Sequence, residues 1–178
     1  YCLTYEEDTE FFNKLKNGEM IQDDNRDADL FEMTMDVLGE AGYAQYEISN
    51  YALPGRESRH NLAYWNGDDY LGFGPGAFST LGGKRWQNIP DSAAYTDRML
   101  NGENTVSFEE EITERIRLGE RIAFSLRTDR GVETSVLQPW REQIAEFLSI
   151  GLLRENGDRI LLTRKGRLLA DSVAEIFV

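Results

Sequence analysis

Residues 140–163, WREQIAEFLSIGLLRENGDRILLT, decide how the end of this chain folds. Ile144 and Phe147 share one face of a predicted helix that closes at Gly151. An Asn-Gly pair between the two apolar runs that follow is a strong signal for a β-hairpin. Thr163 is placed to cap another helix directly after the hairpin. This order of helix, two strands and helix predicts a small winged-helix-like unit.

The stretch before this unit predicts two more helices. Asp91 is placed to cap a short helix that ends at an Asn-Gly pair. Ser107 and the glutamates that follow Phe108 form a capping-box pattern, in which a hydroxyl and a carboxylate satisfy free backbone amides at a helix start. We therefore expect a longer helix from this point, with an apolar face that runs from Ile112 to Leu126.

The first fifty residues alternate between strand and helix patterns. Residues 1–9 are typical of a strand that ends in an acidic loop, and residues 11–18 of a short helix. Residues 24–40 repeat apolar side chains at three- and four-residue spacing, which predicts an amphipathic helix with Asp23 or Asp24 placed to cap its N-terminus. Residues 43–48 have the aromatic and β-branched content of a strand. The order strand, helix, helix, strand fits the tail of an α/β unit with parallel pairing.

The expected fold class is therefore α/β or α+β, with a domain boundary near Asn104. Residues 1–104 would form one domain, and residues 105–178 the helical, winged-helix-like one. Within the first domain, residues 50–88 are rich in glycine and predict an ordered loop with short strands.

The acidic balance of the chain excludes several kinds of partner. Lys and Arg total 19 while Asp and Glu total 32, which gives a formal net charge of −13 and a pI near 4.5. A field of this sign repels polyanions, so nucleic acid and anionic membrane surfaces are poor partners. No run approaches the ~20 apolar residues of a membrane span, and we expect a soluble, cytoplasmic protein.

Cysteine and histidine are scarce. Cys2 is the single cysteine, so this chain alone cannot supply an internal disulfide, an iron–sulfur cluster or a structural zinc site. His60 is the single histidine. Because the sequence opens on Tyr1 without a charged and apolar leader, we expect a piece of a longer protein that lacks a secretory signal.

The winged-helix pattern raises DNA binding as an alternative. Basic residues gather at the predicted hairpin and final helix: Arg154, Arg159, Arg164, Lys165 and Arg167. The net charge argues against a duplex partner. A solvated basic face is the favoured interpretation.

His60 is the candidate ligand of the loop-rich middle. It is followed by Asn61, Tyr64 and Trp65. Imidazole can ligate a haem iron while flanking aromatic rings pack on the flat macrocycle. The alternative is that His60 donates a hydrogen bond to a backbone carbonyl and orders the loop.

Residues 72–79, GFGPGAFS, formally contain the G-x-G-x-x-A spacing of a dinucleotide site. That fingerprint requires a helix directly after the glycines, and Pro75 leaves none here. We interpret Gly72, Gly74 and Gly76 as positions of positive φ or of close backbone approach, to a neighbouring strand or to a flat ligand.

Three segments together resemble the oxygen-independent coproporphyrinogen III oxidase-like (HemN/HemW) proteins of the radical S-adenosylmethionine (SAM) family. They are residues 46–55, YEISNYALPG; residues 59–65, RHNLAYW; and residues 70–77, YLGFGPGA. The HNxxY element that starts at His60 is similar to the HemW-like branch. Residues 126–128, LRT, and 161–166, LLTRKG, are similar to the HemN C-terminal domain, so the resemblance covers nearly the whole chain.

The resemblance implies that residues 1–104 hold the end of a partial (β/α) radical SAM barrel and residues 105–178 a HemN C-terminal-like domain. It implies a [4Fe–4S] cluster on a CxxxCxxC loop and bound SAM in the full-length protein. HemW-like members are regarded as haem chaperones that deliver haem to respiratory apoproteins. HemN enzymes instead decarboxylate coproporphyrinogen III.

In that family picture the histidine of HNxxY binds haem, which assigns His60 as the metal ligand. The rest of the expected haem site is Asn61, Tyr64, Trp65, Gly72, Gly74 and Gly76. Two alternatives stay open: an oxidase that acts on a porphyrinogen by radical chemistry, and a non-catalytic lid or interaction module formed by the residues after Asn104.

The chain departs from the family pattern in two ways. The cluster cysteines are absent, so we expect this piece to be inactive alone. Phe78 stands where relatives usually carry histidine, so weaker or differently coordinated haem is expected. Because a barrel cut open exposes the edge of its last strand, we also expect a dimer, or closure against residues 1–5.

Overall fold

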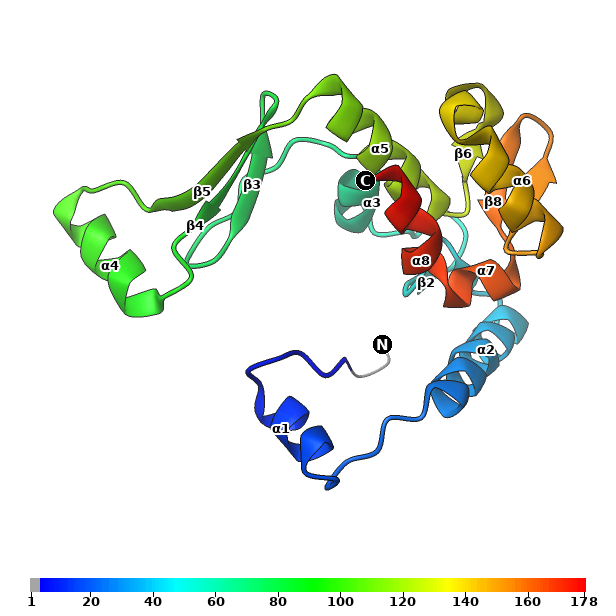
Figure 1. Cartoon of the computed structure of the whole chain (residues 1–178), viewed down its shortest axis with the longest axis horizontal. Coiled ribbons are helices and arrows are strands. Elements are labelled where there is room, and N and C mark those ends of the chain that lie inside the picture. The colour runs from blue at the N-terminus through cyan, green and yellow to red at the C-terminus, as the bar shows by residue number, and fades with distance from the viewer. Residues whose placement is uncertain (1–3) are drawn as a thin grey trace. The chain divides into compact units, whose positions relative to one another are not determined.

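A computed structural model describes residues 4–178 (Figure 1). The chain forms two compact units. The first unit comprises Tyr1–Ser58 and Arg127–Val173, and the second comprises Arg59–Leu126 and Ala174–Val178. The domain boundary expected near Asn104 stays a prediction. The expected strand end over residues 1–9 begins outside the described residues, and no strand is present over residues 4–9.

Two helices begin the first unit, as the sequence predicts. Helix α1 spans Glu10–Lys16 and α2 spans Asp24–Glu40. The side chain of Asp23 caps α2 by accepting a hydrogen bond of 3.1 Å from the amide of Arg26. Several apolar residues of α2, among them Phe31 and Met35, are only half-buried.

The strand expected over residues 43–48 is much shorter and pairs differently. Strand β1 (Ala44–Gln45) pairs antiparallel with β2 (Tyr51–Ala52). The chain turns back between them because the Tyr46 amide donates to the Asn50 carbonyl and the Gln45 side chain donates to the Ile48 carbonyl. Parallel pairing was therefore the wrong expectation for residues 4–178, where every strand pair is antiparallel.

The rest of the first unit is built on a three-stranded sheet in the order β6-β8-β7. The predicted hairpin is confirmed: β7 (Leu153–Asn156) and β8 (Arg159–Leu162) flank the Asn-Gly turn. Strand β6 (Val132–Glu133) adds a third member that the sequence did not indicate. A 3-10 helix, η1 (Thr134–Trp140), leads into the predicted helix α6 (Arg141–Ser149).

The expected final helix is divided into three short pieces: α7 (Arg164–Leu168), α8 (Ala170–Ala174) and η2 (Glu175–Phe177). Thr163 caps α7 as predicted, with its hydroxyl accepting from the Gly166 amide at 3.0 Å. The buried apolar side chains of this part include Ile144, Leu152, Leu153, Ile160, Leu161, Leu162 and Val173. They are apolar residues of the predicted order of helix, two strands and helix, so these residues do contribute to the core of the first unit.

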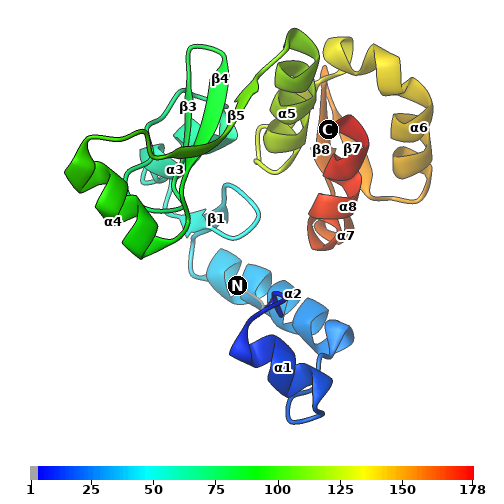
Figure 2. The same cartoon turned by 60° about the vertical axis from the view of Figure 1, so that its left-hand side comes forward.

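The second unit contains a twisted antiparallel sheet (Figure 2). In chain order, helices precede the sheet, connect two of its strands and follow it. Its elements are α3 (Arg59–Trp65), β3 (Phe78–Leu81), β4 (Lys84–Asn88), α4 (Ser92–Asn101), β5 (Val106–Glu111), α5 (Glu114–Leu126) and, from the end of the chain, η2. The sheet order is β3-β4-β5. Helix α4 is confirmed, with Asp91 as its N-cap and Gly102 in the left-handed conformation at its C-cap.

The capping box expected at Ser107 is wrong, because these residues form strand β5. Cross-strand pairing explains the difference: the Glu109 and Glu110 carboxylates bond to the side chains of Lys84 and Arg85 on β4. Thr113 takes the role expected of Ser107, since its hydroxyl accepts from the Ile116 amide at 3.3 Å at the start of α5. The predicted helix is present, but it begins several residues later.

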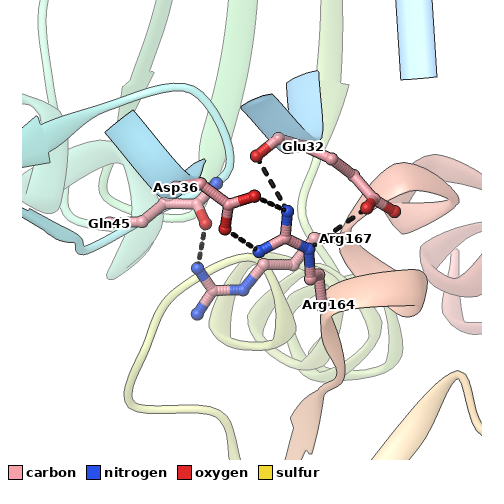
Figure 3. A network of polar contacts seen from close by, with 5 residues as sticks. All are labelled: Glu32, Asp36, Gln45, Arg164 and Arg167. Atoms are coloured by element: carbon pink, nitrogen blue, oxygen red, sulfur yellow. Dashed lines mark hydrogen bonds and ion pairs between the residues drawn. The ribbon is translucent and has the colours of Figure 1, made fainter. Parts of the chain in front are cut away.

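An arginine on α7 ties that helix to α2 within the first unit (Figure 3). The Arg164 guanidinium donates to both carboxylate oxygens of Asp36, at 2.5 and 2.9 Å. It also reaches the Glu32 carboxylate at 3.3 Å and the Glu32 carbonyl at 2.8 Å. Arg167, one turn further along α7, donates to the side-chain oxygen of Gln45. Because the Arg164 guanidinium bonds both oxygens of one carboxylate, this two-pronged contact, the Arg164 fork, fixes the orientation of the two side chains as well as their separation.

The Arg164 fork makes stability depend on pH in a direction that can be tested. Hydrogen bonds from Arg164 lower the pKa of Asp36 below its ordinary value of 3.8. A carboxyl group with a lowered folded pKa contributes stability that is present above its unfolded pKa and lost as pH falls through the folded pKa. Asp36→Asn should therefore be less stable than the parent at pH 7, with a difference that shrinks below about pH 4.

Urea denaturation followed by circular dichroism at several pH values measures this difference. Asp29→Asn changes another exposed carboxylate of the same helix and serves as the matched control. Equal pH profiles for Asp36→Asn, Asp29→Asn and the parent would contradict the assignment.

Candidate functional site

The predicted haem-binding residues of the HNxxY segment lie on helix α3, where the sequence predicts an ordered loop with short strands. His60 and Tyr64 are four residues apart, so they share one face of this 7-residue helix. Their rings meet edge to face with centroids 5.0 Å apart. Tyr64 also meets Tyr70 edge to face, at 4.8 Å. The fold thus builds a row of three rings with His60 at one end.

The other aromatic residue of the segment holds α3 in place. The ring of Trp65 meets that of Phe124 on α5, with centroids 6.0 Å apart. Trp65 and Asn61 are half-buried, whereas His60 and Tyr64 are exposed. The four predicted residues therefore come together on one short helix but divide between a packed side and an exposed side. Packing on α5 explains why a helix forms where the sequence shows no helical period.

The imidazole of His60 is open to a ligand. Within residues 4–178 it has no hydrogen bond or ion pair, and its ring contact is with Tyr64. The carbonyl hydrogen bond that was the alternative interpretation is thus not formed in the described part of the chain. An exposed imidazole beside an aromatic ring has the chemistry that a haem iron and its macrocycle require.

The predicted glycines meet needs of the fold itself. An ideal Cβ on Gly72 would lie 2.0 Å from the carbonyl oxygen of Phe78, so no other residue allows this approach. The Gly72 amide also donates to the Ser79 hydroxyl at 2.9 Å. Gly74 and Gly76 have φ values of 97° and 71°. The glycine segment therefore includes a close backbone approach to a neighbouring strand, one of the two roles left open for it. A strand, β3, follows these glycines rather than a helix.

Phe78 begins β3 and lies on a partly exposed face of the sheet. It stands opposite Gln87 on β4, which in turn stands opposite Phe108 on β5. Both phenylalanines are exposed by more than two fifths. Tyr70 is bridged to Thr80 on β3, so it shares this face.

Tyr70 and Phe108 are the residues of this region that the sequence did not single out. Tyr70 lies within a quoted motif, but its contact with Tyr64 depends on the loop that brings residue 70 back to α3. The capping-box pattern places Phe108 at a helix start, so its position on β5, across β4 from Phe78, could not be predicted.

A partly buried ion cluster joins the sheet to α5. Arg85 on β4 donates to Glu110 on β5 at 2.9 Å and to Glu120 on α5 at 2.7 Å. Burial by itself would lower the pKa of Arg85, but the Glu120 and Glu110 carboxylates outweigh it and raise that pKa. The cluster is an anchor of the scaffold that carries α3 and the aromatic face.

The residues present do not fit an iron–sulfur cluster. Cys2, the one cysteine of the sequence, lies outside the described residues. Among residues 4–178 there is no group of three or more His, Cys, Asp or Glu side chains arranged to hold a metal ion.

Residues 46–51 belong to the first unit, whereas the His60 segment belongs to the second. Tyr46 and Glu47 are buried there, and Glu47 is bridged to Thr128. The carboxylate oxygen Oε1 of Glu47 and the hydroxyl of Tyr51 are buried and have no hydrogen-bond partner among residues 4–178. A buried polar group without a hydrogen-bond partner destabilises the folded protein, so each of these two groups needs an explanation.

Comparisons with known proteins agree on one family. The HemN C-terminal domain family matches residues 106–169. The "Heme chaperone HemW" of Lactococcus lactis is 34% identical over the whole chain and 49% of its own length. That of Mycobacterium tuberculosis is 35% identical over 97% of the chain and 45% of its own length. The mitochondrial "Radical S-adenosyl methionine domain-containing protein 1" of Bos taurus is 32% identical over 96% of the chain and 40% of its own length.

A solved structure is also similar in fold. The radical SAM enzyme coproporphyrinogen III oxidase (HemN) of Escherichia coli matches with a TM-score of 0.65 and 21% identity, over 84% of this chain and 40% of that one. The chain spans about half the length of the curated relatives it matches. None of the helices within residues 4–178 has the length and apolarity to cross a membrane. The chain belongs to the oxygen-independent coproporphyrinogen III oxidase-like (HemN/HemW) radical SAM family, in its HemW-like branch, and corresponds to a C-terminal portion of such a protein.

Proposed function

We propose that this chain is part of a HemW-like haem chaperone and binds haem through His60. The observation that carries the proposal is the exposed imidazole on α3, free of internal hydrogen bonds within residues 4–178 and set beside the ring of Tyr64. Relatives over the whole chain are named haem chaperones, which supports haem as the ligand. Haem supplies an iron that accepts the imidazole lone pair and a flat apolar surface.

The residues of the chain would divide the work of binding. His60 would ligate the iron, and Tyr64 would pack its ring against the macrocycle. Trp65 would hold α3 on α5, because its contact with Phe124 is internal. Asn61 and the glycines Gly72, Gly74 and Gly76 would complete the site through the local shape they give it. With Phe78 where relatives usually carry histidine, this chain would offer one imidazole rather than two.

The wider proposal concerns the full-length protein. Residues 1–104 would belong to the end of a partial (β/α) barrel and residues 105–178 to a winged-helix-like domain. A [4Fe–4S] cluster and SAM would be held by residues outside this chain. The protein would act in the cytoplasm and pass haem to respiratory apoproteins, either alone or as a dimer.

A haem titration tests the ligand assignment. Replacing His60 by alanine should weaken haem binding by at least about tenfold, because loss of the ligand itself should cost no less than loss of a supporting group, which typically costs about 10–100-fold in affinity. The Soret absorbance of added haem measures the affinity, and the Soret position reports the axial ligand.

Arg59→Ala is the matched control, since Arg59 is an exposed neighbour on the same helix. It should bind haem as the parent does, with the same spectrum. Equal affinity and equal spectra for the parent and His60→Ala would refute the role of His60.

A further inference from the structure

Tyr70 contacts the candidate haem site from outside the HNxxY segment. Its ring meets the ring of Tyr64 with centroids 4.8 Å apart, and Tyr64 meets His60 in the same way at 5.0 Å. The interplanar angles are 72° and 86°, so both contacts have the T-shaped geometry that aromatic pairs favour. Tyr70 therefore limits how far the ring of Tyr64 can turn away from His60.

The backbone of Tyr70 is bound to the sheet of the second unit. Its amide donates to the Thr80 carbonyl at 2.7 Å, and the Thr80 amide donates to the Tyr70 carbonyl at 2.9 Å. The carboxylate of the preceding residue, Asp69, accepts from the Gly82 amide at 3.0 Å, in the turn between β3 and β4. Three hydrogen bonds thus hold residues 69–70 on the β3–β4 hairpin.

The imidazole of His60 lacks a support of this kind. It is exposed, and within residues 4–178 it has no hydrogen bond or ion pair that would select one rotamer. A metal-binding histidine usually gains its orientation from a hydrogen bond at its second ring nitrogen. Here the described residues restrain the imidazole through the ring of Tyr64, which is itself 42% exposed. The half-buried ring of Tyr70 is the group that can fix Tyr64.

We propose that Tyr70 is a positioning residue of the haem site. It fixes the ring of Tyr64 against the β3–β4 hairpin, and Tyr64 in turn orients the imidazole of His60 toward the iron. Restraining a side chain before binding reduces the conformational entropy that is lost when the ligand binds. This inference rests on His60 as the haem ligand, as proposed above. The ring of Tyr70 provides the restraint, because its contact with Tyr64 is between rings.

His60 offers a direct readout that needs no haem. It is the single histidine of the sequence, so in protein without a histidine tag its imidazole protons give one set of proton NMR signals. The ring current of Tyr64 shifts these signals. Tyr64→Leu should move them toward the position of a free histidine, and Tyr70→Leu should move them in the same direction by a smaller amount. Tyr70→Phe keeps the ring and should restore the parent signals.

Haem titration measures the consequence for binding. Tyr70→Leu should weaken haem affinity by about three- to tenfold, the range that one aromatic pair supplies, and by less than His60→Ala does. Tyr70→Phe should recover the parent affinity and Soret position. Tyr95→Leu is the matched control, since Tyr95 is a half-buried tyrosine of α4 in the same unit and has no aromatic contact within residues 4–178. It should change neither the NMR signals nor the haem affinity.

The outcomes separate this inference from the proposed function. Far-ultraviolet circular dichroism checks the fold of each variant, and Tyr70→Met repeats the test if Tyr70→Leu alters that spectrum. A shift of the His60 signals in Tyr64→Leu but not in Tyr70→Leu would overturn the positioning role, as would a Tyr70→Phe variant that behaves like Tyr70→Leu. Parent-like haem affinity of His60→Ala would instead refute the ligand, and the NMR comparison would still decide whether Tyr70 orients His60.

Discussion

Gly119→Ala should lower the free energy of unfolding by about 3 kcal/mol, an effect at the upper end for overpacking by one methyl group. An ideal Cβ on Gly119 of α5 would lie 2.0 Å from the carbonyl oxygen of Phe177 and 3.1 Å from its carbonyl carbon. The obstacle is backbone, which cannot turn aside as a flexible side chain does. Alanine favours a helix over glycine by about 1 kcal/mol, too little to offset this displacement of η2 from α5.

Gly39→Ala is the matched control for this prediction. Gly39 also lies inside a helix, α2, but an added Cβ there would meet no heavy atom within 4 Å. The same substitution should therefore raise the free energy of unfolding by about 0.5–1 kcal/mol. Urea denaturation followed by far-ultraviolet circular dichroism measures both changes. Two variants that shift stability in the same direction would contradict the close approach of Phe177 to α5.

Arg85→Met should cost about 2 kcal/mol of stability, less than the 3–5 kcal/mol of a fully buried ion pair because the cluster is partly exposed. The side chains of Arg85, Glu110 and Glu120 are exposed by 21%, 33% and 20%. Removing the guanidinium leaves two partly desolvated carboxylates facing the space it filled. Methionine keeps much of the stem, so the loss measures charge and hydrogen bonds rather than packing.

Lys84→Met supplies the comparison on the neighbouring residue of β4. Lys84 pairs with Glu109 at 3.0 Å, but both side chains are exposed by more than half. Exposed pairs contribute little, so the denaturation midpoint of Lys84→Met should stay close to that of the parent. If Arg85→Met shifted the midpoint no more than Lys84→Met does, the Arg85 cluster would not anchor the sheet to α5.

Local chemistry made parts of this fold predictable. Asp23, Asp91 and Thr163 each begin a helix because a side-chain oxygen can satisfy a free amide without help from distant residues. The Asn-Gly turn between β7 and β8 likewise needs only its own backbone preference. Such features depend on neighbours in sequence, and all four are found where the sequence predicts them.

Other parts depended on partners far away in the chain. The Ser107 pattern predicts a helix start, yet pairing with the strand that holds Lys84 and Arg85 makes it a strand. The sequence of helix α3 lacks a helical apolar period, and the helix is stabilised by packing on α5, where Trp65 contacts Phe124. Both outcomes are set by tertiary contacts, which override weak local preferences.

The candidate sites show the same division. His60, Tyr64 and the family they indicate could be identified from the order of residues, because a motif is a property of sequence. Folding decided the other features. His60 is exposed beside Tyr64, and Gly72 allows the close approach of the Phe78 carbonyl. Tyr51 and Arg167 line one cavity. Side chains separated by more than a hundred positions meet only when the packed chain brings them together, and their burial, hydrogen bonds and charge follow from that meeting.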